Sequence, residues 1–490
     1  MNFLSIDIGT TGCKCQLFSE SGEILKYLFS EYPFLEKDGY HYVNIDAIRS
    51  HLRRMIGEVS AEYKVDSLAI SSLGESFVLL DEGDNVLFYP MLYTDPRGEE
   101  EAREILRAVG EETCFRISGV LPHSMYSVSK LLWIKKHHPE LYARADKVLL
   151  VGEYIGYLLT GERVIDYGLG ARTGVLDVVK RDFSCEMLKA LDLPRSLFSA
   201  VKRTGSVVGK VKPEVACSLG MKNSPTLVLG SHDQICTSLG AGVLSEGDAV
   251  DGMGTVECIT TLHSSKPENV VMGRQGYPVV PYAIEGLYCS YFWNFSCCST
   301  VNWYRKKIMH EYAGEEKNFF AYIEKEIESR PTGILTLPYL GGASTPYQNL
   351  DAKGVIIGLS TETTDRQLFQ SLLEGTAMEM RFNAEIAEGY GIPIKNVVAT
   401  GGGANSVRWL QLKADIQNIP VKTLRSSEGG LCGCAMLQAV AMGSAADLFA
   451  ARDVFVRYAK EFVPHKEAHA AYEEDYNKYK KIYHLVKELY

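Results

Sequence analysis

The chain has 490 residues, of which 46% are hydrophobic and 23% are charged, and its formal net charge is −10. This length exceeds what one hydrophobic core usually supports, so we expect two domains of similar size. The acidic balance argues against nucleic acid or an anionic membrane surface as the main partner, because both require a basic face.

The N-terminal stretch is unlike a secretory signal, because it lacks a basic region and places Asp7 inside its first apolar run. No charge-free apolar run is long enough to span a bilayer, so we expect a cytoplasmic protein. The 12 cysteines are spread over the chain without zinc-ribbon spacing, which favours buried reduced thiols. Their close pairs are Cys13/Cys15, Cys297/Cys298 and Cys432/Cys434.

The first chemical signal is a strand that ends in an acidic residue and a Gly-Thr-Thr turn. Residues 3–8 lead into Gly9-Thr10-Thr11, and β-rich runs follow at 13–18 and 24–29. P-loop and dinucleotide folds place a helix after their glycine turn, and the pattern GxxxxGK[ST] does not occur in this chain. We therefore expect a β-hairpin whose amides and threonine hydroxyls hold phosphate, with an ordinary tight turn as the alternative.

A similar pattern recurs near the middle of the chain. Residues 249–262 again place an aspartate just before a Gly-Thr turn, Gly254-Thr255, between two β-rich runs. The repetition predicts a duplication, with domains at residues 1–245 and 246–490 that each carry one phosphate hairpin. Two such hairpins facing each other across a cleft would hold the phosphates of a nucleotide from both sides.

A third signal of nucleotide binding lies late in the chain. Residues 396–400 predict a buried strand, residues 401–406 a turn and residues 407–417 an amphipathic helix. The glycines of the turn, Gly401, Gly402 and Gly403, would let the backbone approach a flat ring or a ribose. The start of a helix is the alternative role of this triple glycine.

These three elements, in this order, resemble the FGGY family of carbohydrate kinases, in the actin and Hsp70 ATPase superfamily. Further family-like stretches lie at residues 125–137, 157–162, 335–340, 345–347, 354–359 and 367–374. The resemblance covers essentially the whole chain. It implies an α/β fold of two ribonuclease H-like domains, with ATP and a sugar in the interdomain cleft and hinge closure during turnover.

The resemblance also implies a catalytic base. Phosphoryl transfer requires an aligned acceptor hydroxyl, charge neutralisation by Mg²⁺ and hydrogen-bond donors, and a base for the hydroxyl proton. Asp233 follows the short apolar strand at residues 227–229 and matches the catalytic aspartate of the family, with Gln234 beside it at the sugar site. The alternative is that Asp233 caps the helix beginning near Gln234. Asp7 is the candidate for organising Mg²⁺ through water.

The remaining candidates would contact the nucleotide. Thr10, Thr11 and Lys14 would touch phosphate oxygens, although a solvated strand position is the alternative for Lys14. Gly254 and Thr255 would form the opposing side of the phosphate site. The residues assigned to the rest of the nucleotide are Asn302, Gly401, Gly402, Gly403 and Asn405.

The sugar site departs from the sequences that are usual in the family. Ahead of residues 77–81 stands Gly74-Glu75-Ser76, where xylulokinases usually carry Met-His-Gly and glycerol kinases Arg-Glu-Thr. Glu75 thus resembles the acidic residue of the glycerol site without its arginine, and an exposed structural glutamate is the alternative. Asp95 and Arg97 match an Asp-x-Arg segment and either line the same pocket or form an ion pair that braces it.

We therefore expect ATP-dependent phosphorylation of a small sugar, with a ketose such as xylulose or ribulose ahead of glycerol, erythritol or a sugar acid. A nonenzymatic ATP switch of the actin or Hsp70 kind is the competing class, and the polar set around Asp233 and Glu75 opposes it. Residues 466–490 carry apolar and aromatic side chains at helical spacing. They predict an amphipathic helix packed on the body, with homodimerisation as its alternative role.

Overall fold

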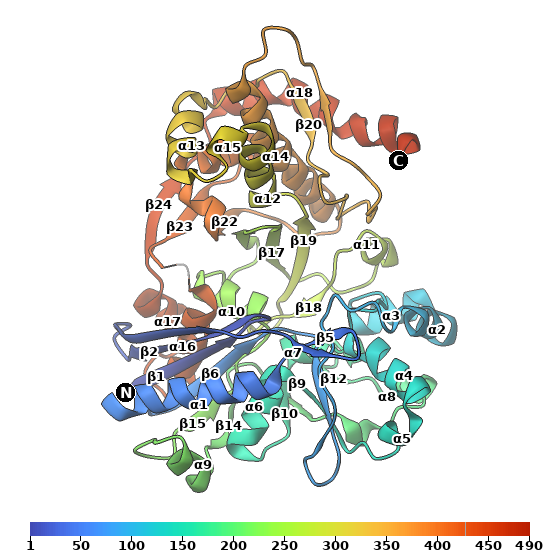
Figure 1. Ribbon diagram of the computed structural model, residues 1–490, viewed down its shortest axis with the longest axis vertical. Helices are drawn as coiled ribbons and strands as arrows, with labels where there is room; N and C mark the ends of the chain where they lie inside the picture. Colours follow the sequence, from blue (N-terminus) through green and yellow to red (C-terminus); the bar gives the residue numbers. More distant parts are fainter. Residues whose placement is uncertain (427) are drawn as a thin grey trace.

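The computed structural model describes residues 1–426 and 428–490, and two large sheets form the centres of a lower and an upper lobe (Figure 1). The lower sheet has the strand order β14-β15-β6-β1-β2-β3, and the upper sheet has the order β18-β19-β17-β16-β22-β23-β24. The lower strands are β1 (Asn2–Ile8), β2 (Gly12–Ser19), β3 (Ile24–Glu31), β6 (Ser67–Ser72), β14 (Val207–Lys210) and β15 (Thr226–Val228). The upper strands are β16 (Asp248–Met253), β17 (Glu257–His263), β18 (Val280–Pro281), β19 (Tyr288–Asn294), β22 (Asn396–Thr400), β23 (Val421–Leu424) and β24 (Tyr458–Phe462).

The two sheets repeat one pattern of strand pairing. In the lower sheet β1 pairs antiparallel with β2 and parallel with β6, and β2 pairs antiparallel with β3. In the upper sheet β16 pairs antiparallel with β17 and parallel with β22, and β17 pairs antiparallel with β19. Each sheet continues with one more parallel strand, β15 or β23, and an antiparallel edge strand, β14 or β24. The predicted duplication and mixed α/β class are confirmed.

Helices cover both faces of the lower sheet. On one face lies α1 (Ile45–Glu62), which begins at Asn44, whose Oδ1 accepts a hydrogen bond from the Ala47 amide at 3.0 Å. On the other face, α10 (Asp233–Gly240) and α16 (Gly429–Ala441) pack together, and α16 contacts β1 and β6. The helix α16 thus returns from the C-terminal part of the chain to the lower lobe (Figure 1).

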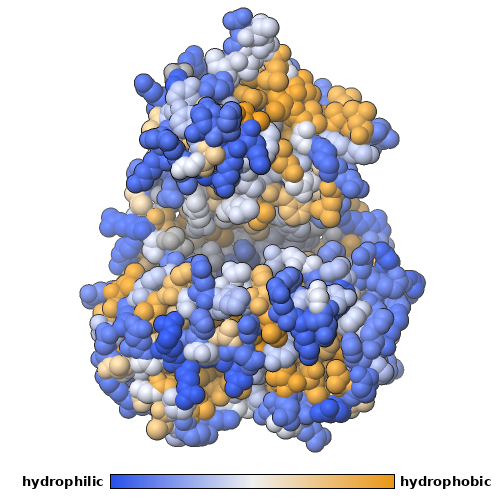
Figure 2. All heavy atoms as spheres, in the orientation of Figure 1, coloured by the Kyte–Doolittle hydropathy of each residue, from blue (hydrophilic) through white to orange (hydrophobic). Residues whose placement is uncertain are grey.

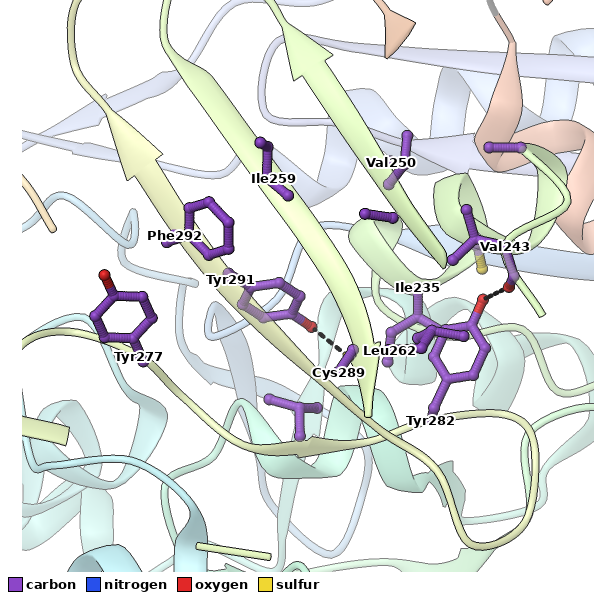
Figure 3. Close-up of a cluster of buried hydrophobic side chains, with 14 of the residues drawn as sticks. Ile235, Val243, Val250, Ile259, Leu262, Tyr277, Tyr282, Cys289, Tyr291 and Phe292 are labelled. Carbon is purple, nitrogen blue, oxygen red and sulfur yellow. Dashed lines mark hydrogen bonds between the residues drawn. The ribbon is translucent and has the colours of Figure 1, made fainter. Parts of the chain in front are cut away.

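Glycines bring the backbones of α10 and α16 into direct contact. A Cβ atom on Gly240 would lie 1.9 Å from the Gly429 carbonyl oxygen, and one on Gly433 would lie 2.0 Å from the Cys236 carbonyl oxygen. Ile235 of α10 and Val243, in the segment after this helix, join a buried cluster with Leu262 of the second sheet (Figure 3). The two lobes are therefore connected at α10.

A smaller sheet, ordered β8-β7-β9, is inserted after β6 and carries the candidate sugar site on its connections. Its strands are β7 (Phe77–Leu80), β8 (Val86–Phe88) and β9 (Lys147–Leu150). The remaining helices of this lobe are α2 (Glu99–Val109), α3 (Glu111–Ser118), α4 (Ser127–His137), α5 (Pro139–Tyr142), α6 (Val151–Thr160), α7 (Tyr167–Ala171), α8 (Cys185–Ala190) and α9 (Pro213–Ser218). Its short strands are β4 (Leu35–Lys37), β5 (Tyr40–Tyr42), β10 (Val164–Asp166), β11 (Leu176–Asp177), β12 (Asp182–Phe183) and β13 (Ala200–Lys202).

The upper lobe ends in a long helix that confirms the predicted amphipathic segment. The helix α18 (Lys466–Val486) buries Tyr472, Tyr476 and Tyr479, and the Tyr472 hydroxyl donates to Glu374 Oε1 of α14 at 3.0 Å. The other elements of this lobe are α11 (Val270–Arg274), α12 (Cys298–Trp303), α13 (Glu316–Ile323), α14 (Asp365–Gly389), α15 (Val407–Gln417), β20 (Leu335–Leu337) and β21 (Val355–Ile357). The helix α17 (Leu448–Phe455) lies in the lower lobe, where it packs on α16 and the ring of Phe455 lies 6.3 Å from that of Phe3 and 5.8 Å from that of Phe18 (Figure 1). Among the described residues, we find no helix with the length and apolar character that crossing a membrane requires.

Candidate active site

The first hairpin turn joins β1 to β2, and a tyrosine hydroxyl forms hydrogen bonds with its backbone. The Gly9 amide donates to the Gly12 carbonyl at 2.9 Å, and the Tyr32 hydroxyl donates to the carbonyls of Gly9 and Gly12 at 2.6 and 3.1 Å. Thr10 is half-buried and Thr11 is exposed. The backbone of the turn is therefore fixed, and the Thr11 side chain stays accessible to a ligand.

Asp7 lies at the end of β1, opposite Lys14 in the strand register. Its Oδ1 accepts a hydrogen bond from Ser71 Oγ at 2.7 Å, and burial raises the pKa of the Asp7 carboxyl. A Cβ atom on Gly430 would lie 3.5 Å from Asp7 Oδ1, so the start of α16 also faces this carboxylate. A carboxylate oxygen held by a single hydroxyl is a suitable oxygen donor toward a hydrated Mg²⁺.

Lys14 is not a simple solvated strand residue. Its Nζ lies 2.7 Å from Glu428 Oε2, and the Tyr27 hydroxyl donates to Glu428 Oε1 at 3.3 Å. The glutamate stands just before α16, so this ion pair ties the first hairpin to the returning C-terminal helix. The ammonium lies near the Asp7 end of the hairpin, where it would also face phosphate.

Asp233 is the first residue of α10, and the N-cap is His232, so capping is not the role of the aspartate. Its side chain is 40% exposed in the recess, whereas its Oδ1 atom is buried and lies 3.1 Å from His232 Nε2. The surrounding protein desolvates the carboxyl and, with the charges of Asp7 and Glu75, raises the pKa of Asp233 to about 7. This value suits a general base that works near neutral pH.

The predicted sugar residue Glu75 is buried rather than exposed, and its backbone has a positive φ of 51°. Arg172, just after α7, donates from Nε to Glu75 Oε1 at 2.7 Å and also from Nη2 to the same oxygen. Gly74 has no arginine side chain, but a Cβ atom there would lie 2.9 Å from Arg172 Cγ. The chain thus brings a guanidinium to Glu75 from a distant segment.

Aromatic rings from both lobes enclose this ion pair. The Arg172 guanidinium lies 5.2 Å from the ring centre of Tyr126 and 5.9 Å from that of Tyr291. Tyr291 belongs to β19 of the upper sheet (Figure 3), and its ring centre lies 6.3 Å from that of His232. The surroundings of Arg172 are therefore built from both lobes, and Figure 2 shows a recess that crosses the molecule between them.

Asp95 and Arg97 form a buried ion pair with each other. Arg97 donates from Nε to Asp95 Oδ1 at 2.9 Å and from Nη1 to the Tyr42 hydroxyl at 2.9 Å. Burial alone would raise the pKa of Asp95, but the hydrogen bonds and charge of Arg97 outweigh it and lower the pKa. The Lys130 ammonium donates to the Asp95 carbonyl at 2.9 Å. These contacts favour the bracing role of the two alternatives.

The second hairpin turn, between β16 and β17, resembles the first. The Gly254 amide donates to the Val256 carbonyl at 3.0 Å, and Thr255 is exposed. The helix α12 begins directly on this turn, because the Cys298 amide donates to the Gly254 carbonyl at 3.1 Å and the Ser299 amide to the Thr255 carbonyl at 3.2 Å. The backbone of α12 therefore fixes the hairpin from one side.

A buried charge cluster lies beneath the second hairpin. Lys413 of α15 forms ion pairs with Asp251 of β16 and Glu257 of β17, and all three side chains are almost fully buried. Asp251 precedes its Gly-Thr turn as Asp7 precedes the first, but it is paired with an ammonium. Burial and the neighbouring Asp251 raise the pKa of Glu257, and the Lys413 ammonium opposes this shift.

The glycine turn after β22 packs on the second hairpin. Gly401 has a φ of 82°, and a Cβ atom there would lie 2.7 Å from the Met253 carbonyl oxygen. A Cβ atom on Gly403 would lie 2.8 Å from Met253 Cβ, whereas Gly402 faces Cys298. The predicted strand, turn and helix at residues 396–417 are confirmed.

Two further nucleotide candidates lie on the surface of this region. Asn405 is exposed and, with Gly401, lines a cavity of about 360 Å³ beside the ends of β22 and β23. Asn302 is exposed on α12, and its Oδ1 accepts a hydrogen bond from Arg305 Nη2 at 3.2 Å. Gln234, the second residue of α10, is half-buried beside Asp233.

Sequence reasoning missed four residues of this arrangement, namely Arg172, Tyr126, Tyr291 and Lys413. Tyr126 lies in a family-like stretch, and the other three lie in no local motif that indicates a role. Among those three, only the position of Arg172 could have indicated a role. It is a charged residue within the Gly- and Ala-rich stretch 168–174, and a charge is unusual in a buried segment.

Comparison with known proteins identifies relatives over nearly the whole chain. Residues 2–240 match the N-terminal domain of the FGGY family of carbohydrate kinases, and residues 253–442 match its C-terminal domain. A xylulose kinase of Bacillus subtilis (strain 168) is 26% identical over 498 residues, which cover 99% of this chain and 97% of the relative.

Solved structures share the complete fold. A xylulose kinase from Rhodospirillum rubrum superposes with a TM-score of 0.91 at 22% identity, covering 100% of this chain and 99% of that one. A gluconate kinase from Lactobacillus acidophilus superposes with a TM-score of 0.90 at 22% identity, covering 99% and 98%.

Proposed function

Because this chain belongs to the FGGY family of carbohydrate kinases, we propose that it transfers the γ-phosphoryl group of ATP to a hydroxyl of a small ketose such as xylulose or ribulose. The single observation that carries this proposal is the position of Asp233. Its carboxyl has a pKa of about 7, and the charges of Asp7 and Glu75 both contribute to raising this pKa. The base thus stands between the phosphate hairpin and the acceptor pocket.

In the proposed mechanism Asp233 accepts the proton of the sugar hydroxyl as that oxygen attacks the γ-phosphorus. The buried His232 ring faces Oδ1, so the rest of the carboxyl is directed to the recess. Glu75 and Arg172 orient the acceptor, because together they offer a carboxylate that accepts and a guanidinium that donates hydrogen bonds. Positioning and electrostatics supply most of the rate in this type of reaction.

The two hairpins and the glycine turn would bind ATP in the proposed complex. Thr10, Thr11 and Lys14 face the phosphates from the lower lobe, and Gly254 and Thr255 face them from the upper lobe. The adenosine would lie on the second lobe, against Gly401, Gly402, Gly403, Asn405 and Asn302.

Asp7 would hold Mg²⁺ through water, and the ion would neutralise phosphate charge during transfer. The division near residue 245 gives each proposed domain one hairpin. We further propose that the reaction takes place in the cytoplasm, where ATP and Mg²⁺ are available.

A second acceptor class, the sugar acids, is favoured by one specific observation. Within the described residues, Arg172 Nη1 is buried without a hydrogen-bond partner. A carboxylate on the acceptor would satisfy this donor, which costs about 1–3 kcal/mol when it is left unpaired. The gluconate kinase whose structure shares this fold is consistent with a sugar acid as the acceptor.

The test is a coupled ADP-release screen with MgATP against ketoses, aldoses, polyols and sugar acids. We expect a ketose to give the highest kcat/KM. Gluconate and its uncharged counterpart glucitol form a matched pair within the panel. Preference for gluconate over both glucitol and the ketoses would replace the first acceptor class by the second, and a flat panel with normal MgATP binding would contradict both.

A further inference from the structure

A buried carboxylate, Asp166, is hydrogen-bonded to the loop that carries the proposed base. Asp166 is the last residue of β10 and the N-cap of α7, and it is 2% exposed. Its Oδ2 accepts hydrogen bonds from Ser231 Oγ at 2.6 Å and from Thr204 Oγ1 at 2.7 Å. Ser231 precedes Asp233 by two positions. One hydroxyl therefore links this carboxylate to the loop of the base.

The same carboxylate fixes the start of α7, which leads to Arg172. The Gly168 amide donates to Asp166 Oδ2 at 3.0 Å, and the Leu169 amide donates to Oδ1 at 3.1 Å. Arg172 is the residue after this short helix, and its amide donates to the Leu169 carbonyl at 3.0 Å. Asp166 thus binds both the segment that carries the arginine of the acceptor site and the loop that carries the base.

The start of α7 also packs directly on this loop. A Cβ atom on Gly168 would lie 2.4 Å from Ser231 Oγ and 2.2 Å from Ile235 Cδ1 of α10. The Ser231 carbonyl accepts a hydrogen bond from the Ser72 amide, at the end of β6, at 3.2 Å. A glycine is required at position 168 for so close an approach. A displacement of either segment would therefore be passed to the other.

Packing alone does not fix the loop. A cavity of about 30 Å³ is lined by residues of both segments, among them Gly230, Ser231 and Asp166. Burial raises the pKa of Asp166, and the hydrogen bonds from Ser231 and Thr204 oppose this shift. Hydrogen bonds to a carboxylate are stronger than those between neutral groups. The bond between Asp166 and Ser231 is therefore a main determinant of where the loop lies.

We propose that Asp166 is a positioning residue, which holds Asp233 in line with the acceptor through the Ser231 hydroxyl. This inference rests on the proposed function. Asp166 touches neither substrate in this account, and it sets the distance between the base and an acceptor that Arg172 orients. Alignment is decisive in phosphoryl transfer, and a displacement of about 1 Å can lower a rate by about 100-fold.

The first test is steady-state kinetics of Ser231→Ala, which removes only the hydroxyl that joins the loop to Asp166. We expect kcat to fall by about tenfold or more, with less than about a twofold change in the KM for the sugar and in the Kd for MgADP. The rise of kcat/KM with pH should remain, because Asp233 is still the base. An unchanged kcat, or equal changes in all three constants, would overturn the proposal.

The matched control is Ser118→Ala, the same substitution at a serine that is also 1% exposed. The Ser118 hydroxyl donates to the carbonyls of Cys114 and Val120 at 2.8 and 3.0 Å, in α3 and just after it. Both variants should lower Tm, because each loses a buried hydrogen bond. Only Ser231→Ala should lower kcat. An equal loss of kcat in the two variants would attribute it to lost stability and would overturn the proposal.

The second test is a cycle of Asp166→Asn, Ser231→Ala and the double variant. Asp166→Asn places an amide group against hydrogen-bond donors, so both α7 and the loop should shift. We expect kcat to fall and the KM for the sugar to rise, each by about tenfold or more. In this background Ser231→Ala should lower kcat by less than about threefold, because its partner is already lost. Full additivity would overturn the proposal. If Asp166→Asn does not fold, Ser231→Ala and its control decide.

The unmodified protein separates failure of this inference from failure of the proposed function. If it phosphorylates a sugar with MgATP, but Ser231→Ala keeps the same kcat, only the positioning role is wrong. If it binds MgATP and phosphorylates no sugar, the proposed function and the positioning role are both wrong.

Discussion

Arg172 donates from Nε to Glu75 Oε1 at 2.7 Å, across 97 positions of sequence. The pair is buried, so removing either partner leaves a charge without compensation and costs more than a surface pair would. The charge of Glu75 also helps to raise the pKa of Asp233, so the two carboxyl groups are close enough to interact.

We expect Glu75→Gln to raise the KM for the sugar by about tenfold or more, the equivalent of about 1.4 kcal/mol, with a smaller change in the KM for ATP. Steady-state kinetics with each substrate varied in turn measures this. Glu99→Gln, at an exposed position of α2 that pairs with Arg103, is the matched control and should change neither value. Equal effects on both KM values would show that Glu75 acts on folding alone.

Asp233 should impose a pH dependence on the reaction. A base acts in its deprotonated form, so kcat/KM should rise about tenfold per pH unit below a pKa of about 7 and level off above it. We expect Asp233→Asn to lower kcat by about 10²- to 10⁴-fold and to remove this limb, with MgADP affinity within about tenfold. The exposed control Asp192→Asn should keep the profile. A rise in kcat/KM that persists in Asp233→Asn would assign it to another group.

Much of the fold could be predicted from sequence because its signals are local. Hydrophobic period and turn residues indicate three segments. These are the hairpin at β1–β2, the strand, turn and helix at residues 396–417, and the terminal helix α18. The duplication followed from one repeated pattern, an aspartate before a Gly-Thr turn, and the matching pairing of the two sheets confirms it.

The site could be predicted only in part, because its pairs are made by tertiary contacts. Nothing near Arg172 in sequence shows that its partner is Glu75, and nothing near Lys413 shows that it pairs with Asp251 and Glu257. The apolar composition of α16 indicates burial but not that this helix returns to the lower sheet. Long-range pairing of this kind is set by how the elements pack.

Lys413 should be essential to the stability of the upper lobe. Lys413→Met removes the only cation that the described structure pairs with Asp251 and Glu257, so both carboxyl groups lose their buried partner. Breaking a buried ion pair in this way costs about 3–5 kcal/mol. Chemical denaturation would measure the loss. Lys478→Met, at an exposed position of α18, is the control and should cost about 0–1 kcal/mol. Equal stability of the two variants would show that the cluster contributes nothing.

The packing of α18 on α14 should weaken as the pH rises. Burial raises the pKa of Glu379 from 4.5 to about 7, and Tyr339 and Tyr479 donate to its Oε2. The folded state binds this proton more tightly than the unfolded chain, so its contribution is complete below pH 4.5 and is lost as the pH rises through about 7. The difference corresponds to about 3 kcal/mol.

Thermal denaturation between pH 5 and 8 would measure the effect of Glu379. We expect Glu379→Gln to flatten the fall in Tm, because the amide does not ionise. Glu388→Gln, at an exposed position of the same helix, should keep the fall of the unmodified protein. Parallel curves for all three proteins would exclude Glu379 as the titrating group.

The most direct test of phosphoryl transfer is sugar-dependent ADP release with MgATP, measured together with the sugar phosphate by mass spectrometry, for the unmodified protein and Asp233→Asn side by side. We predict that at least one small sugar gives ADP and sugar phosphate in equal amounts, and that the variant forms both at least about 100-fold more slowly. ADP release that no sugar increases despite normal MgATP binding, or full turnover in the variant, would contradict the proposed reaction.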